Sequence, residues 1–158
     1  GVFSSAVTIA HLRTVEVSCC KITDDGLRVF AQYLVKNRTI KVIDVSSNLL
    51  TADGIWVIAE PLRANESLET LRINDNRLAD SGARAIASVL KFNLSLREVN
   101  AAGNGIYSKG AGILIKVLAL RLAPIEVHMH GNPCTREKTF LEMEQKLTRK
   151  NPIITIHR

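Results

Sequence analysis

The chain has 158 residues, of which 46% are hydrophobic and 4% aromatic, and it carries a formal net charge of +6. This length and apolar content are sufficient for one domain with a continuous core of aliphatic side chains. No run of eighteen apolar residues occurs, which excludes a membrane-spanning helix from the sequence. The basic residues are not interleaved with aromatic ones, which argues against nucleic-acid binding.

The first eleven residues are predicted to form the second half of a helix that recurs along the chain. A 28-residue period continues backwards past Leu12 and places Val2 and Phe3 at core positions. We expect these two side chains to pack against Val29 and Phe30, so that residues 1–11 form half a repeat. A chain that begins within a repeat is expected to be part of a longer protein.

A strand pattern starts at Leu12 and recurs with this 28-residue period. Apolar residues occupy its positions one, four, six and eleven, with asparagine or cysteine at position nine, in copies that begin at Leu12, Ile40, Leu68, Leu96 and, in weaker form, Pro124. The alternation predicts a short strand with one face turned inward. The recurring amides are predicted to bond backbone groups where the chain leaves the strand, at Asn48, Asn76, Asn104 and Asn132, with Cys20 in the same place in the first copy.

A helix is predicted after each of the first four strands. Segments rich in Ser, Thr and Asp, which cap exposed amides, precede these helices at 23–26, 51–54, 79–82 and 107–110. Apolar residues then recur at i, i+3, i+4 and i+7, which is one face of a helix. Asn37, Asn65 and Asn93 stand near helix ends and also match glycosylation sequons, but their shared place in the repeat favours a structural role.

The last segment breaks the pattern. A helix is predicted over Thr135–Lys150, with Phe140, Met143 and Leu147 on its apolar face in a register that has slipped by one. A short strand follows at 153–157. A charged outer helix that closes the array is what a terminal repeat requires, so residues 135–158 are predicted to be a C-terminal cap.

These repeats resemble the ribonuclease-inhibitor-like subfamily of leucine-rich-repeat proteins over residues 12–134. The resemblance implies an α/β solenoid, with short parallel strands on a concave face and helices on a convex face. The expected organisation is a single domain over 1–158, made of a half repeat (1–11), about five 28-residue repeats (12–134) and a capping helix and strand (135–158).

The size of the array and its ending, a long helix followed by a strand, are similar to the C-terminal domain of tropomodulins and leiomodins. This resemblance implies a protein-interaction scaffold with actin or another cytoskeletal component as partner, although no actin contact can be transferred by position. Two alternatives stay open: a GTPase-activating or other regulatory leucine-rich-repeat region, and an architectural spacer in a larger protein.

The three cysteines argue for a reducing compartment, and therefore for the cytoplasm. Their number is odd, and Cys19 and Cys20 are adjacent in the expected strand, where their side chains would point to opposite faces. Cys134 stands alone, and no cysteine spacing matches a zinc site. No catalytic constellation and no cofactor-binding or metal-binding motif was recognised, so an enzyme is not expected.

Partner binding is expected on the concave face, where outward side chains of successive strands form columns. The candidate partner-binding residues, all from these columns, are Glu16, Asp44, Arg72, Asn74, Asn100, His128 and His130. Trp56, the single tryptophan, is predicted to lie on the convex side, either stacked between Arg28 and Arg84 or free to anchor a partner.

Three histidines near the end of the chain are predicted to share the concave face. His128 and His130 are two residues apart in a strand, and the terminal strand is expected to pair beside them. With Ile154 and Ile156 inward, the predicted register places His157 next to His130. Three imidazoles there would suit a zinc or nickel ion or a pH-sensitive patch, although solvated histidines are the commoner case.

Overall fold

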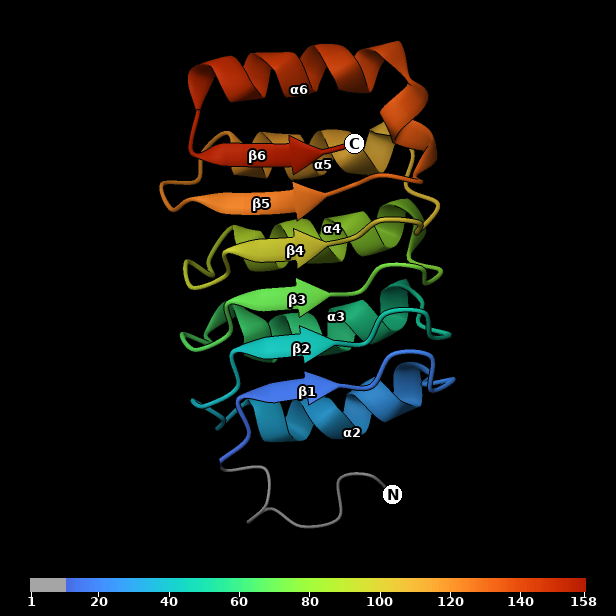
Figure 1. The fold of residues 1–158 in the computed structure, drawn as a ribbon, viewed down its shortest axis with the longest axis vertical. Helices are drawn as coiled ribbons and strands as arrows, with labels where there is room; N and C mark the ends of the chain where they lie inside the picture. The colour runs from blue at the N-terminus through green and yellow to red at the C-terminus, as the bar shows by residue number, and fades with distance from the viewer. Residues whose placement is uncertain (1–10) are drawn as a thin grey trace.

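The computed structural model describes residues 11–158 and shows two parallel layers, a sheet and a row of helices (Figure 1). One sheet contains six parallel strands in sequence order: β1 (Thr14–Glu16), β2 (Val42–Asp44), β3 (Thr70–Arg72), β4 (Glu98–Asn100), β5 (Ile125–His128) and β6 (Ile154–His157). The helices are α2 (Asp24–Leu34), α3 (Ala52–Arg63), α4 (Ala79–Leu90), α5 (Ser108–Leu118) and α6 (Lys138–Lys150), with a short 3-10 turn, η1 (Pro133–Arg136). The expected contacts of Val2 and Phe3 lie outside the described residues.

The 28-residue repeat found in the sequence is the physical repeat of the fold. The first five strands pair with their neighbours in a register equal to this 28-residue spacing. The successive Cα partners therefore include Val15, Ile43, Leu71, Val99 and Val127. These side chains are all buried between the sheet and the helices. The opposite side of the sheet faces away from the helices and is called the concave face below. The alternation of apolar and polar residues in each strand therefore separates a buried face from a solvent-exposed one.

A ladder of asparagine side chains holds the turns that follow the strands. Asn48 Nδ2 donates to the carbonyl oxygens of Val17 and Val45, both at 2.9 Å, and Asn48 Oδ1 accepts from the backbone N–H of Cys20 and Ile22. Asn76, Asn104 and Asn132 are buried in the same place of the later repeats. These amides satisfy backbone groups that no strand partner reaches, as the sequence predicted.

The first turn differs from the later ones. Cys19 and Cys20 lie in the turn after β1 and not in a strand, and both are exposed. Cys19 has a φ of +55°, a conformation outside extended backbone. The expectation that their side chains point to opposite sheet faces is therefore wrong, because β1 ends at Glu16.

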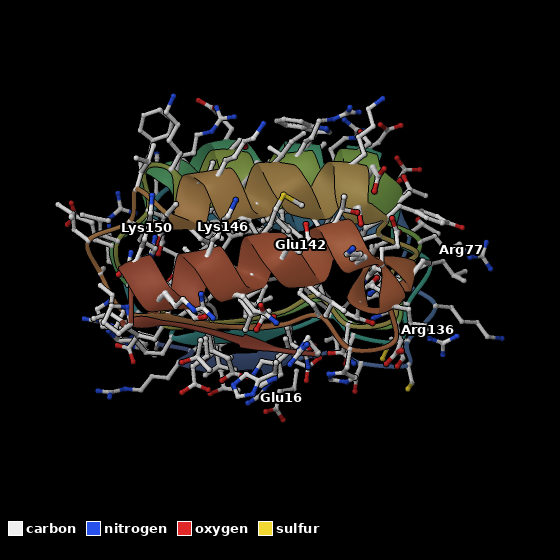
Figure 2. The ribbon with its side chains drawn as sticks, turned by 90° about the horizontal axis from the view of Figure 1, so that it is seen from above. Glu16, Arg77, Arg136, Glu142, Lys146 and Lys150 are labelled. Atoms are coloured by element: carbon white, nitrogen blue, oxygen red, sulfur yellow. The ribbon has the colours of Figure 1, made fainter. Side chains whose placement is uncertain are left out.

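The last helix, α6, lies beside α5 and above β6 (Figures 1 and 2). Two residues of α6, Phe140 and Leu147, are buried on its inner side. Glu142, Lys146 and Lys150 follow one another at a spacing of four residues on its exposed side (Figure 2). The charged outer side of α6 is present as expected, while its role as a C-terminal cap stays a prediction. Within residues 11–158, no helix is long and apolar enough to cross a membrane.

Candidate protein-interaction surfaces

The concave face carries the predicted column of polar side chains. Glu16, Asp44 and Arg72 are successive Cα partners across β1, β2 and β3, and the column continues through Asn100 and His128. Glu16 is exposed and the other four are half-buried. The structure therefore contains the predicted column, while its role in partner binding stays a prediction.

Several polar groups on this face already form hydrogen bonds or ion pairs within the chain. Asp44 Oδ1 accepts hydrogen bonds from both the backbone N–H and the hydroxyl of Ser46, and Arg72 Nε lies 3.5 Å from Glu98 Oε1. Asn74 donates to Asp75 Oδ2 at 2.8 Å. A partner that bound these groups would have to replace existing interactions. The column alone therefore does not distinguish a binding surface from a solvated one.

The histidines meet at the C-terminal end of the concave face, in a different register from the expected one. His157 is the Cα partner of His128, and not of His130, because β6 is displaced by two positions along β5 relative to the predicted pairing. The rings of His128 and His157 stack with centroids 4.4 Å apart, whereas the His130 ring lies edge-on to His128 at 6.4 Å. Ile154 and Ile156 do point inward as predicted, opposite Ile125 and Val127.

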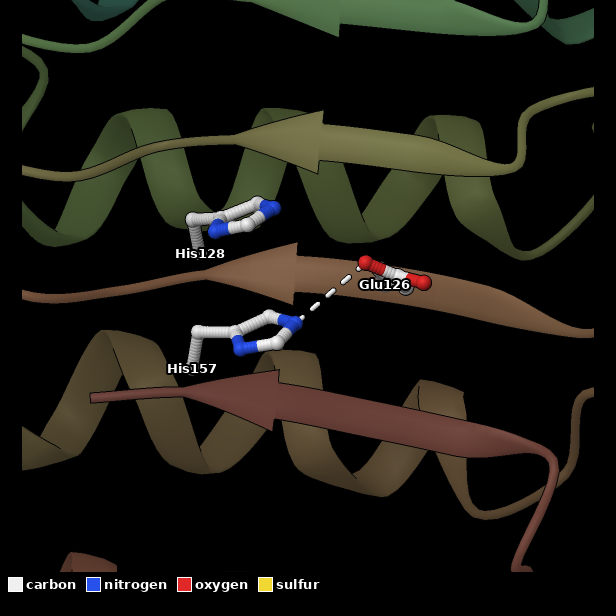
Figure 3. A group of neighbouring side chains, drawn as sticks. All are labelled: Glu126, His128 and His157. Atoms are coloured by element: carbon white, nitrogen blue, oxygen red, sulfur yellow. Dashed lines mark hydrogen bonds and ion pairs between the residues drawn. The ribbon is translucent and has the colours of Figure 1, made fainter.

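The surroundings of His128 change the pKa of its imidazole. Burial lowers the pKa of His128, and the adjacent His157 lowers it further, against the opposing effect of the carboxylates of Glu98 and Glu126. His157 Nε2 lies 3.3 Å from Glu126 Oε2 (Figure 3). One carboxylate and two imidazoles thus lie together on the last two strands.

On the convex side, Trp56 is partly exposed, with 39% of its surface accessible. The expected stack with Arg28 and Arg84 is wrong for the described part of the chain: the cation–π contact found there is Lys91 Nζ over the Phe92 ring at 5.3 Å. Arg28 instead approaches Asp25 on its own helix, at 3.8 Å. Trp56 as an anchor for a partner stays a prediction.

An apolar surface that the sequence analysis missed lies on the loops that lead from α4 into β4 and from α5 into β5. Phe92 and Leu94 are 59% and 57% exposed, and Leu120 and Leu122 are 83% and 89% exposed. We call these four residues the rim patch. Burying such side chains is favourable, so exposing four of them on two adjoining loops is unusual.

The rim patch was visible in the repeat register. The position that Phe92 and Leu120 share is held by Lys36 and Ala64 in the first two repeats. Leu94 and Leu122 correspond in the same way to Arg38 and Glu66. The change from charged or small residues to large apolar ones at loop positions, confined to the third and fourth repeats, was the signal.

A groove adjoins the rim patch, with a volume of about 400 Å³. Its walls combine apolar residues from α4, α5 and their loops with three basic side chains, and the lining residues are Leu90, Lys91, Leu94, Lys116, Val117, Leu120, Arg121 and Leu122. Lys91 and Lys116 are exposed, whereas Arg121 is buried and bonded to backbone carbonyls. The groove therefore combines an apolar lining with two exposed ammonium groups and one buried guanidinium.

Comparisons with known proteins agree with this architecture. A family model described as a leucine-rich repeat matches residues 8–31 and 64–87. No curated protein sequence matches the chain. Among solved structures, that of leiomodin-1 actin-binding site 2 (ABS2) aligns with a TM-score of 0.82 at 19% sequence identity, over 96% of this chain and 90% of that one. At this identity the likeness establishes a shared fold.

Proposed function

We propose that this chain, which is a leucine-rich-repeat protein, works as a protein-interaction module and not as an enzyme. The observation that carries the proposal is the rim patch, in which Phe92, Leu94, Leu120 and Leu122 are each more than half exposed. Leu94, Leu120 and Leu122 line one groove, and exposed apolar patches on folded proteins mark interaction sites.

The charge around the rim patch favours an acidic, amphipathic partner segment. Lys91 and Lys116 border the groove, and the chain as a whole carries a formal charge of +6. Apolar side chains of the partner would enter the groove, while its carboxylates would meet the two ammonium groups at the border. Opposite charges at such a border accelerate association and select the partner more than they add affinity.

Actin, or a protein bound to actin filaments, is the partner class that we propose. The support is the shared fold with leiomodin-1 actin-binding site 2, which includes the helix α6 and the strand β6 after the repeats, since the alignment covers 96% of this chain. The three cysteines are unpaired, which agrees with a reducing compartment and with cytoplasmic work of this kind. The concave column from Glu16 to His128 is the competing contact surface.

Co-sedimentation with actin filaments, combined with surface variants, tests both parts of the proposal. Leu94→Asp/Leu122→Asp should abolish binding, because it places charge in the apolar surface. Tyr107→Asp/Leu49→Asp is the matched control, since it changes two exposed apolar residues that follow the strands, whereas the rim patch precedes them. Circular dichroism should show all variants folded, because each changed side chain is exposed.

Further variants separate the remaining outcomes. Arg72→Glu and Trp56→Ala should bind like the parent, and loss of binding in either one alone would assign the contact to the concave face or to the convex side. Absence of any sedimentation with filaments would refute actin as the partner. Affinity capture from a cell lysate, compared between the parent and Leu94→Asp/Leu122→Asp, would then test the rim patch independently of actin.

A further inference from the structure

The last two strands bring two imidazoles and a carboxylate together on the concave face (Figure 3). His128 of β5 and His157 of β6 are Cα partners, and their rings stack with an interplanar angle of 11°. Glu126 precedes His128 by two residues, so its side chain leaves the same face of the strand. Its Oε2 atom lies 3.3 Å from Nε2 of His157.

We propose that Glu126, His128 and His157 form a binding site for a divalent metal ion of the zinc class. One nitrogen from each imidazole and one carboxylate oxygen already lie within 4.8 Å of one another. Ligand atoms that surround a tetrahedral zinc ion at about 2.0–2.2 Å are separated from each other by roughly 3.4 Å. Glu126 and His157 are exposed, so rotation of their side chains can close this difference without disturbing the core.

The backbone beneath the three side chains is fixed. Met129 N–H donates to the His157 carbonyl at 2.7 Å, and Ile125 N–H donates to Ile153 at 3.2 Å, so hydrogen bonds on both sides of the site hold β6 against β5. The buried side chain of Ile154 anchors β6 to the core. A site on paired strands keeps its ligands in place better than a site on loops.

The donor set and the local charge indicate which cation fits. Two imidazoles and one carboxylate suit zinc and its neighbours, whereas calcium and magnesium prefer oxygen ligands alone. Glu98 lies beside Glu126 on β4, where it pairs with Arg72, and it adds a second carboxylate near the imidazoles. Three protein ligands leave one tetrahedral position for water or for a side chain of a bound protein.

A bound ion would connect the terminal strand to the repeats and so stabilise the cap. The test uses the whole chain without a histidine tag, in a Cys19→Ser/Cys20→Ser background, because these two thiols are exposed and thiolates are zinc ligands in general. Calorimetric titration with zinc chloride should show one site, and zinc should raise the melting temperature. Calcium chloride should produce neither effect.

Single variants assign the ligands. His128→Ala, His157→Ala and Glu126→Gln should each weaken zinc binding at least about tenfold. His130→Ala and His11→Ala should bind zinc like the parent, because neither side chain belongs to the group of three. Substitution of cobalt(II) for zinc provides a readout that does not depend on stability: the parent should show the visible absorption of four-coordinate cobalt, and His157→Ala should lose it.

Two results would overturn the site itself, and a third would overturn its assigned ligands. One is the absence of zinc binding at about 100 μM, which would leave the three residues as a solvated group stabilised by stacking and one ion pair. The other is an unchanged zinc affinity in both His128→Ala and His157→Ala. An equal loss in His130→Ala and His157→Ala would likewise contradict the assigned ligand set.

Discussion

The guanidinium of Arg121 donates a hydrogen bond from Nη1 to the carbonyl oxygen of Asn93, the residue that precedes it by 28 positions. One repeat earlier, the amide of Asn93 donates in the same way to the carbonyl of Asn65, at 2.8 Å. Arg121 Nη1 also reaches the Leu90 carbonyl at 3.1 Å, as Asn93 reaches that of Leu62 at 2.8 Å. Arg121 therefore replaces the recurring asparagine at the helix ends.

Arg121 also replaces a serine. Its Nη2 donates to the carbonyl of Leu96 at 2.7 Å, where the hydroxyl of Ser95 donates to the carbonyl of Leu68 in the repeat before. The position that corresponds to Ser95 is Ala123, which has no hydroxyl. One guanidinium thus supplies the donors of two side chains. Burial lowers the pKa of Arg121, which reflects the cost of holding this charge away from water.

Arg121→Ala is expected to destabilise the fold by about 2–4 kcal/mol, because the substitution leaves three carbonyls without these donors and a buried carbonyl without a donor costs about 1–3 kcal/mol. The three carbonyls are those of Leu90, Asn93 and Leu96. Urea unfolding followed by circular dichroism measures the difference. A loss no larger than that of an ordinary surface substitution, about 0.5 kcal/mol, would show that water replaces the guanidinium.

A double substitution tests the equivalence directly. Arg121→Asn/Ala123→Ser restores the pair of side chains present at Asn93 and Ser95, and it should recover more than half of the stability lost in Arg121→Ala. Full recovery is not expected, because Pro124 has no N–H to donate to the new amide oxygen, whereas Leu96 N–H donates to Asn93 Oδ1 at 2.9 Å. A double variant no more stable than Arg121→Ala would contradict the replacement.

The recurring asparagines, after the strands and at the helix ends, explain why so much of the fold follows from the sequence. A strand, a turn and a helix each need particular residues at fixed positions, and the 28-residue spacing repeats these requirements. The pairing of Val15 with Ile43 and of Val99 with Val127 could be predicted because register equals repeat length. Four copies of one pattern determine a register better than a single copy does.

The cap could not be predicted in the same detail. Ile154 pairs with Ile125, one position beyond the repeat length, because η1 and α6 replace the usual turn and helix. Inward positions of Ile154 and Ile156 follow from apolar alternation, but alternation does not distinguish registers that differ by two positions. For this reason the sequence correctly placed His157 on the concave face and wrongly paired it with His130.

Asn93→Ala is expected to cost about 2–4 kcal/mol of unfolding free energy, because removal of the amide leaves two buried carbonyls and two N–H groups without this partner. Asn93 is 1% exposed and donates to the carbonyls of Leu62 and Asn65, while its Oδ1 accepts from Ser95 N–H and Leu96 N–H. Urea unfolding measures the change.

Asn74→Ala is the matched control for Asn93→Ala. Asn74 is half-buried, and its side chain donates to the exposed Asp75, so its removal should change the stability by less than about 0.5 kcal/mol. Equal losses of unfolding free energy in the two variants would indicate that the buried amide of Asn93 stabilises the fold no more than the half-buried amide of Asn74 does.

Gly54→Ala is expected to destabilise the chain, although alanine favours helices. A Cβ atom at Gly54 would approach Oδ1 of Asp24 to well under 3.0 Å, closer than real Cβ contacts come. This carboxylate accepts hydrogen bonds from the N–H and the hydroxyl of Thr51, at 2.9 and 2.6 Å, and cannot move without losing them. Thermal unfolding should show a lower melting temperature.

The same substitution should be less destabilising when the carboxylate is removed, although the Cα atom of residue 24 would remain 3.3 Å from the new Cβ. In an Asp24→Ala background, the alanine at position 54 no longer meets Oδ1, so its helix propensity, worth up to about 1 kcal/mol over glycine, becomes visible. The double-mutant cycle of Gly54→Ala with Asp24→Ala should therefore show a strong coupling. Additive effects would mean that the close approach of Gly54 to Asp24 is relieved by other adjustments.

Alkylation should distinguish the three cysteines of the folded chain. Cys19 and Cys20 are exposed, whereas Cys134 is buried in η1. Burial raises the pKa of the Cys134 thiol to about 12, with further contributions from the negative charges of Glu137 and Asp80. Iodoacetamide at pH 8 should modify Cys19 and Cys20 and leave Cys134 unmodified, as mass spectrometry of peptides can show. Early modification of Cys134 would mean that η1 opens under native conditions.

The raised pKa of Cys134 also predicts how stability changes with pH. The ordinary pKa of a cysteine thiol is 9.0, so below this pH Cys134 is protonated in both the folded and the unfolded chain. Between pH 9 and about 12 the unfolded chain loses this proton and the folded chain keeps it, so the unfolded state binds fewer protons and stability falls as pH rises. Melting temperatures measured from pH 8 to pH 10 should decline more steeply for the parent than for Cys134→Ala, which lacks the ionising group. Parallel curves for the two proteins would show that the Cys134 thiol ionises without unfolding.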